Sequence, residues 1–282
     1  MLKSSADLNE PFGESRYHAG WLYAIYGRDN MNKPNKKYDP EVRIYGSVKE
    51  LMEAAARILE EEAARAVTSN RELYVALPGG DTPRTLYRRL AEEPFRSEIS
   101  WSRIHFFWSD ERCVPPNHPE SNFRMVSDTL LSRISIPEKN IHRIRGEARP
   151  DEEAGRYGRE INQVVPIISG GMPRFSWILL GLGKDGHTAS LFPEAAAMHA
   201  AKIICATAVH PESGRRRITM TLPLINNAAR ISFIVSGKDK AEIVSEILNK
   251  DSDHRRYPAA MVASKDGLFE WLLDAGAASA LQ

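Results

Sequence analysis

The sequence contains little cysteine, no long apolar run and almost no excess of either charge. Its 282 residues include only Cys113 and Cys205, which are too few for a disulfide framework. No apolar stretch approaches the roughly 20 residues that cross a bilayer. The polar N-terminus also lacks the apolar centre of a signal peptide. We therefore expect a protein of a reducing compartment, and the cytoplasm is the simplest one.

The near-neutral charge argues against two classes of partner. Lys and Arg total 38 and Asp and Glu total 37, which gives a formal net charge of +1. Proteins that bind nucleic acid or membrane surfaces are usually more basic. We therefore expect neither as a partner, and any anion site must be local.

Several common catalytic signatures are also missing. The sequence contains no G-x-S-x-G elbow, no Walker A loop and no H-E-x-x-H pair. Its histidines are scattered and, with two cysteines, give no zinc-binding spacing, so we expect no metal site.

The chain divides near residue 40. Residues 1–40 combine aromatic side chains with the breaker-rich stretch GRDNMNKPNKKYDP, which predicts an extension with little regular structure. No linker rich in Pro, Gly or Ser follows it, so residues 41–282 are expected to form a single α/β domain.

Strands and helices are predicted to alternate through this domain. The first strand is Val42–Gly46, and Ser47 with Glu50 forms a capping-box signature for a helix over 47–67. Further strands are expected over 72–80, 103–110, 141–145, 175–181, 202–209, 217–222 and 231–237, and helices over 82–93, 121–133, 151–165 and 238–250. Several strands are continuously apolar, as in strands that are covered on both faces. This pattern predicts a mostly parallel sheet flanked by helices on both faces.

The segment GLGKDGHTASLFP, residues 181–193, spells G-x-G-x-x-G after a predicted strand. A dinucleotide-binding turn would need a helix directly after the glycines and an acidic residue about 20 positions later. Pro193 interrupts any such helix, and 201–211 contains no Asp or Glu. The segment therefore predicts a tight loop that presents Asp185 and His187, either as site residues or as a turn cap and a surface histidine.

A second glycine-containing turn, PGGDTP, follows the strand at 72–80. Gly79 and Gly80 allow close backbone approach to a ligand, and Thr82-Pro83 suits a helix start. The free N–H groups of a helix start bind anions, although an ordinary strand-to-helix connection has the same pattern. Asp81 must either point away from such an anion or cap the helix.

Two other strand ends carry polar residues. Asp110 and Arg112 follow the strand at 103–110, which suits either substrate contacts or a surface turn. Arg217 begins a strand, and Lys240 lies in the first turn of a helix, where the helix dipole disfavours a cation. The position of Lys240 hints at a bound anion, with a solvated lysine as the alternative.

Four segments occur together in a specific order: LPGGDTP, WSDERCVPPNHPESN, GLGKDGHTASLFP and RITMTLPLINNA…FIVSGKDKA. Over about residues 42–275 the chain closely resembles the 6-phosphogluconolactonase family, which is related to glucosamine-6-phosphate deaminases and sugar-phosphate isomerases. The resemblance implies a Rossmann-like, glucosamine-6-phosphate deaminase-like fold without a dinucleotide. It also implies the hydrolysis of 6-phospho-D-glucono-1,5-lactone in the oxidative pentose phosphate pathway. It implies a small-molecule sugar-phosphate lactone as ligand, no cofactor or metal, and a monomer or weak homo-oligomer.

The resemblance also implies roles for individual residues. His187 would be the general base that activates water, and Asp185 would orient it or contact the sugar. The remaining residues would bind substrate: Asp110 and Arg112 at the lactone end, and Gly79, Gly80, Thr82, Arg217 and Lys240 around the phosphate.

Two alternatives remain at this point. In the related amino-sugar-6-phosphate deaminases the corresponding loop has a glutamate just before the proline, where this chain has Phe192, which cannot transfer a proton. A non-catalytic sugar-phosphate sensor would need a DNA-binding module, and residues 1–40 show no helix-turn-helix pattern.

Overall fold

The computed structural model describes residues 40–168, 171–193, 203–250 and 253–281. The expected N-terminal extension therefore lies outside the described residues, apart from Pro40. The strands are β1 (Glu41–Tyr45), β2 (Leu73–Leu77), β3 (Ile104–Trp108), β4 (Asp110–Arg112), β5 (Ile141–His142), β6 (Trp177–Leu180), β7 (Cys205–Val209), β8 (Arg216–Met220), β9 (Arg230–Val235) and β10 (Leu268–Asp274). The α-helices are α2 (Val48–Thr68), α3 (Asp81–Leu90), α4 (Phe95–Glu98), α5 (Asn122–Thr129), α6 (Pro150–Val164), α7 (Leu222–Ile225) and α8 (Ala241–Leu248).

Seven strands form one sheet in the order β1-β10-β9-β6-β2-β3-β5, and every pairing in it is parallel. The chain builds outward from β2 through β3 to β5, and then returns to place β6 on the other side of β2. Ligands of open α/β sheets bind at such a reversal, outside the carboxyl ends of the strands. The predicted Rossmann-like sheet is confirmed, and its topology marks the carboxyl ends of β2 and β6.

A second sheet was not predicted. Strands β4, β8 and β7 form a three-stranded antiparallel sheet. The segment predicted as one strand over 103–110 breaks at Ser109. The N–H of Ser109 bonds to Leu77 in the large sheet, while its carbonyl accepts from Met220 in the small one. Ser109 is therefore the residue at which the chain passes between the two sheets.

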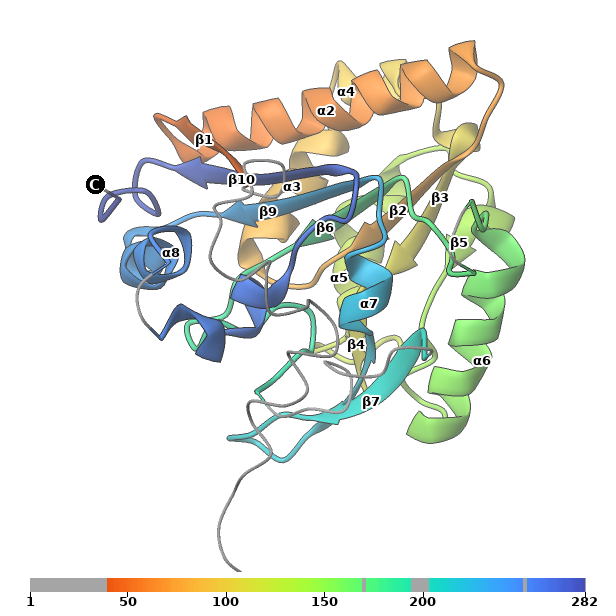
Figure 1. Cartoon of the computed structure of the whole chain (residues 1–282). Helices are drawn as coiled ribbons and strands as arrows, with labels where there is room; N and C mark the ends of the chain where they lie inside the picture. Colours follow the sequence, from red (N-terminus) through yellow and green to blue (C-terminus); the bar gives the residue numbers. More distant parts are fainter. Residues whose placement is uncertain (1–39, 169–170, 194–202, 251–252, 282) are drawn as a thin grey trace, which may run out of the picture. The chain divides into compact units, whose positions relative to one another are not determined.

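Helix α2 begins as its capping signature predicts. The Ser47 hydroxyl accepts the Glu50 N–H at 3.2 Å, and the Glu50 carboxylate accepts the Gly46 N–H at 3.0 Å. These bonds satisfy N–H groups that have no partner within a helix. In Figure 1, α2 runs along one face of the large sheet with α3 and α4 beside it, while α7 and α8 lie on the other side. The sheet is thus covered on both faces.

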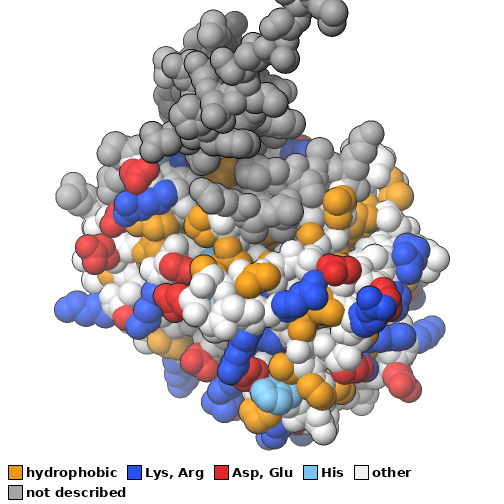
Figure 2. Space-filling model, turned by 90° about the horizontal axis from the view of Figure 1, so that it is seen from below, with side chains coloured by type: hydrophobic (Ala, Val, Ile, Leu, Met, Phe, Trp, Pro, Cys, Tyr) orange, Lys and Arg blue, Asp and Glu red, His pale blue; other side chains and the backbone are white. Residues whose placement is uncertain are grey.

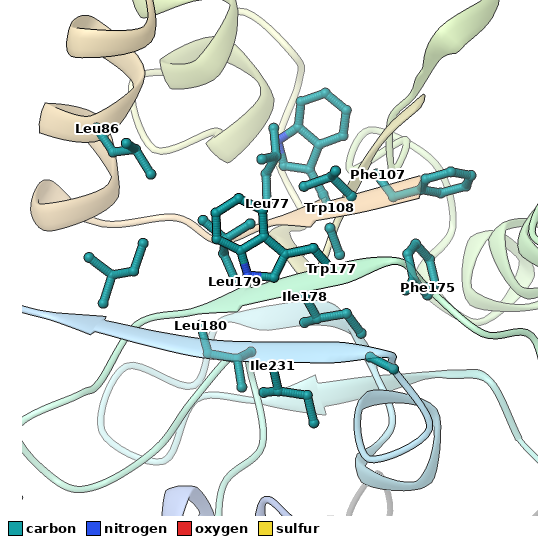
Figure 3. Close-up of a cluster of buried hydrophobic side chains, with 14 of the residues drawn as sticks. Leu77, Leu86, Phe107, Trp108, Phe175, Trp177, Ile178, Leu179, Leu180 and Ile231 are labelled. Carbon is teal, nitrogen blue, oxygen red and sulfur yellow. The ribbon is translucent and has the colours of Figure 1, made fainter. Parts of the chain in front are cut away.

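The core follows from the apolar strands. Every residue of β6 and of β9 is buried, as expected for central strands between two helical layers. Trp177 and Leu179 project from one face of β6, and Ile178 and Leu180 project from the other (Figure 3). Leu86 of α3 projects toward this cluster (Figure 3).

The surface agrees with the balanced composition. On the face shown in Figure 2, basic and acidic side chains are interspersed among apolar ones. None of the helices in the described ranges is long and apolar enough to cross a membrane.

A buried ionic network ties the beginnings of three strands to α2. The Glu270 side chain is fully buried in β10 and accepts from Arg230 Nε at 2.7 Å and from the Ser232 hydroxyl at 2.5 Å. Arg230 also pairs with Glu62 of α2 at 3.0 Å, and Trp177 Nε1 donates to Ser232 at 2.8 Å. The Glu270 carboxylate and the Arg230 guanidinium depend on each other, because both are buried and neither is readily solvated by water.

Replacing Glu270 with alanine should lower the free energy of unfolding by about 3–5 kcal/mol, because it leaves the Arg230 guanidinium buried with half of its partners. Chemical denaturation of wild type and variant measures the difference. Glu41→Ala is the control: its carboxylate pairs with Arg43 at the surface, where it is 51% exposed, and it should cost about 1 kcal/mol or less. Equal effects for the two variants would contradict the network's role.

Candidate active site

The loops that carry the predicted site residues follow adjacent strands. In the large sheet β9, β6, β2 and β3 are neighbours, and their carboxyl ends lead into Ser236, Gly181, Pro78 and Ser109 respectively. A Cβ added to Gly181 would lie only 3.8 Å from the Gly79 carbonyl oxygen, so these two loops touch. The parallel sheet thus gathers segments that are far apart in sequence along one edge.

Asp185 and His187 form a hydrogen-bonded pair. His187 Nδ1 lies 2.5 Å from Asp185 Oδ1, and the two side chains are 22% and 45% exposed. Burial acts to raise the pKa of Asp185, but its bond and charge interaction with His187 prevail and lower that pKa to about 2. An ionised carboxylate only accepts hydrogen bonds, so Nδ1 carries the proton. In the neutral ring, Nε2 is then the atom able to accept a proton.

Two glycines allow the loop to hold this pair. A Cβ on Gly183 would lie 2.3 Å from His187 Nδ1 and 2.5 Å from Asp185 Oδ1, so any side chain there would displace the pair. Gly186 has φ +78°, and a Cβ on it would lie 2.4 Å from the Tyr257 ring. Gly183 therefore leaves room for the pair, and Gly186 allows both the left-handed turn and its packing against Tyr257.

The loop continues without a helix through Pro193. Thr188 forms a β-bridge with Leu191, and its hydroxyl donates to the Gly181 carbonyl at 2.8 Å. The prediction that residues 187–193 do not open a dinucleotide-binding helix is confirmed.

Asp110 is buried and bonded to three elements. Its carboxylate accepts from the Ser190 hydroxyl at 2.6 Å and from Asn122 Nδ2 at 3.2 Å, and it lies 3.8 Å from an Arg217 nitrogen. Asp110, which lies on β4, therefore links that strand to α5 and to the loop of His187. Its carboxylate has few hydrogen-bond acceptor positions left for a ligand.

Arg112 and Arg217 lie directly opposite each other on β4 and β8. Paired residues of antiparallel strands project to the same side, so the two guanidinium groups share one face. The Nε atoms of both are buried without a hydrogen-bond partner among the described residues. Burial, together with the charge of Arg112, lowers the pKa of Arg217. Two adjacent cations with unused donors favour an anion.

Helix α3 begins at Asp81, with Gly80 as its N-cap and no side-chain cap. The Asp81 side chain is 93% exposed and lies 3.4 Å from Arg84, so it points away from the helix start. The Thr82 hydroxyl lies 2.8 Å from that of Ser236, the residue that follows β9. The segments that follow β2 and β9 are therefore in contact.

Lys240 ends a short 3-10 helix (Lys238–Lys240) and precedes α8. Burial lowers the pKa of Lys240, and Lys184 acts in the same direction while Asp185 opposes it. Lys240 thus lies within electrostatic reach of the Asp185–His187 pair.

Sequence reasoning missed several residues that support this site. The buried Glu111 carboxylate accepts the backbone N–H groups of Arg112, Asn122 and Phe123, each at 2.8 Å, and so fixes the start of α5 against β4. Burial raises the pKa of Glu111 against the effect of these bonds. The acidic Glu111, followed by a helix that Ser121 caps, is a sequence pattern from which this contact could have been predicted.

Phe192 lies at the centre of a second missed group. Its ring is 3% exposed, and its centroid lies 5.0 Å from that of His187 and 5.2 Å from that of His210. The Arg217 guanidinium lies 5.6 Å from the same ring. No signal in the sequence connects His210 to His187, because the contact depends on how the small sheet folds.

Comparison with known proteins shows which family this chain belongs to. A model described as glucosamine-6-phosphate isomerases/6-phosphogluconolactonase matches residues 46–271, which is most of the chain. The chain belongs to this isomerase/lactonase family.

Relatives within the isomerase/lactonase family resemble the chain over nearly their whole length. A 6-phosphogluconolactonase of Haemophilus influenzae is 44% identical over 208 residues, covering 74% of this chain and 87% of the relative. The structure of a devB protein matches with TM-score 0.80 and 39% identity over 85% of this chain and 98% of its own. The 6-phosphogluconolactonase of Trypanosoma brucei matches with TM-score 0.78 and 28% identity, covering 87% and 100% of the two chains.

Gly186→Ala should lower the free energy of unfolding by at least about 2–3 kcal/mol, because left-handed backbone strain and a clash with Tyr257 add together. Gly214→Ala is a matched control. It has φ +64° but nothing within 4 Å of the added Cβ, so it should cost about 1 kcal/mol. Urea denaturation measures both, and equal losses would show that Tyr257 does not constrain the loop.

Proposed function

We infer that this protein is a 6-phosphogluconolactonase, which hydrolyses 6-phospho-D-glucono-1,5-lactone to 6-phospho-D-gluconate in the oxidative pentose phosphate pathway. The observation that carries the inference is the Asp185–His187 pair, which lies near partly buried cations in a chain that belongs to this family. The relatives from Haemophilus influenzae and Trypanosoma brucei carry the same enzyme name.

The first step of the proposed mechanism is addition of water. Nε2 of His187 accepts a proton from a water molecule while the water oxygen bonds to the lactone carbonyl carbon. Asp185 keeps the ring oriented through Nδ1 and stabilises the imidazolium that forms. General-base assistance of this kind contributes roughly 10²–10⁴-fold.

The second step breaks the lactone ring. The tetrahedral oxyanion reforms a carbonyl, the bond from that carbon to the ring oxygen breaks, and His187 Nε2 returns its proton to the departing oxygen. One water molecule has then been added across one ester bond. The Arg112 guanidinium, which lies on β4 opposite Arg217, is proposed to stabilise the oxyanion.

Substrate recognition is proposed to rest on the phosphate. The α3 start at Gly79, Gly80 and Thr82 supplies unpaired N–H groups, and Lys240 and Arg217 supply charge. Binding energy from this remote group positions the lactone next to His187. Asp110 acts in this proposal by holding Arg217 and the loop of His187 in place.

An amino-sugar-6-phosphate deaminase is the nearest alternative within the family. That reaction moves protons between carbons and needs an acid next to the histidine. Position 192 is instead occupied by a buried phenylalanine packed between His187, His210 and Arg217. This packing supports the lactonase and leaves no proton carrier there.

Wild-type protein should consume 6-phosphogluconolactone well above its spontaneous rate, and His187→Gln should lose at least about 10²-fold in kcat. Thermal unfolding should change little, since the His187 side chain is partly exposed. Wild-type activity in the variant would remove His187 from the mechanism. Ammonia release from glucosamine 6-phosphate, without lactone hydrolysis, would replace the proposed function by deamination.

Lys240→Ala should raise KM for the phosphorylated lactone by about 10-fold, with a smaller effect on kcat, because a charged hydrogen bond to the phosphate is lost. The same variant should leave the rate with unphosphorylated gluconolactone unchanged. Lys49→Ala is the control, since Lys49 also lies in the first turn of a helix, α2, but follows the edge strand β1, which β10 separates from β9. An unchanged preference for the phosphorylated substrate would exclude Lys240 as a phosphate ligand.

A further inference from the structure

His210 is a second histidine beside the Asp185–His187 pair. It follows β7 and opens the turn into β8, with its N–H bonded to Arg215 and its carbonyl to the Gly214 N–H. Its ring centroid lies 6.3 Å from that of His187, and the rings are nearly perpendicular at 80°. The hairpin of the small sheet therefore brings His210 to the reacting end of the proposed site.

The local bonding of His210 decides which ring nitrogen carries a proton. The Ser213 N–H donates to His210 Nδ1 at 3.3 Å, so Nδ1 has to be unprotonated. The neutral ring then carries its proton on Nε2. This Nε2–H group has no hydrogen-bond partner within the described ranges. The Nε2–H group of His210 is thus available to donate a hydrogen bond to a ligand.

The surroundings of His210 favour its uncharged ring. Burial lowers its pKa, and so do the charges of Arg217 and His187, while Glu212 and Asp185 oppose them. The neutral ring can donate a hydrogen bond without competing with Arg217 for an anion.

We propose that His210 is a specificity-determining residue that donates a hydrogen bond from Nε2 to an oxygen of the sugar ring beside His187. The proposal rests on the proposed lactonase function. The cations Arg217 and Lys240 are charged and suit the phosphate, whereas a neutral donor suits a hydroxyl or the lactone oxygen. Phe192, packed edge-on against His210, holds the ring in place.

The chain offers a matched control for this residue. The tetrapeptide His-Pro-Glu-Ser occurs at both 118 and 210. His118 Nδ1 accepts the Glu120 N–H at 3.2 Å, which is the same kind of local bond as at His210. The proposed mechanism gives His118 no role, so substitutions at 118 report the effect of losing only the local bond.

The test compares His210→Phe, His210→Gln and His118→Phe on 6-phosphogluconolactone and on unphosphorylated gluconolactone. His210→Phe should lower kcat/KM by about 10-fold on both substrates, because both carry the sugar ring. His210→Gln keeps a donor near the Nε2 position and should stay within about 3-fold of wild type. His118→Phe should match wild type, and thermal unfolding confirms that each variant is folded.

Three results would overturn the proposal. They are wild-type kinetics for His210→Phe, equal losses for the Phe and Gln variants, or a loss confined to the phosphorylated substrate, which would place His210 at the phosphate. None of these affects the proposed function. That function fails separately, if wild-type protein does not accelerate lactone hydrolysis.

Discussion

The parallel pairing of β6 with β2 is the constraint on which the site depends. Because the chain reverses its direction of growth between these two strands, their carboxyl ends mark the position at which open α/β sheets bind ligands. The loop of His187 leaves one strand and the α3 start leaves the other. The neighbouring strands β9 and β3 add Ser236 and Ser109 to the same edge. Residues spread over more than half of the chain are thus set side by side by hydrogen bonds of the backbone alone.

Electrostatics explains how a protein of net charge +1 can still attract a doubly charged ligand. The carboxylates near the cations are already occupied: Asp110 by Ser190 and Asn122, and Glu111 by backbone N–H groups. These acids hold the loops in place and present few free oxygens to a ligand. The guanidinium donors of Arg112 and Arg217 stay partly unused. Hydrogen-bond donors for an anion are therefore left over at the site, although acidic and basic residues are balanced over the whole chain.

The sequence predicted the large sheet and the Asp185–His187 pair because both produce patterns within short segments of the chain. Continuous apolar runs mark buried strands, and a spacing of two residues in a glycine-rich turn brings a carboxylate to an imidazole. The strands β7 and β8 of the small sheet were predicted, but their sheet was missed because β4 has only three residues and is separated from β3 by Ser109 alone. Tyr257 and His210 were missed for a different reason, since each reaches the loop of His187 only through tertiary packing. Asp110 was identified, but its bonds to Ser190 and Asn122 depend on three separate elements.

The loop that holds Asp185 and His187 is closed on itself, because the Gly183 N–H bonds to the His187 carbonyl at 2.8 Å. The bond within the pair and the bond that closes its loop join residues at most four apart, whereas Arg112 and Arg217 come from other strands. In the proposed mechanism, proton transfer and substrate recognition therefore fall to separate parts of the chain. Substitutions in the surrounding loops could then change which sugar phosphate binds and leave the Asp185–His187 pair intact.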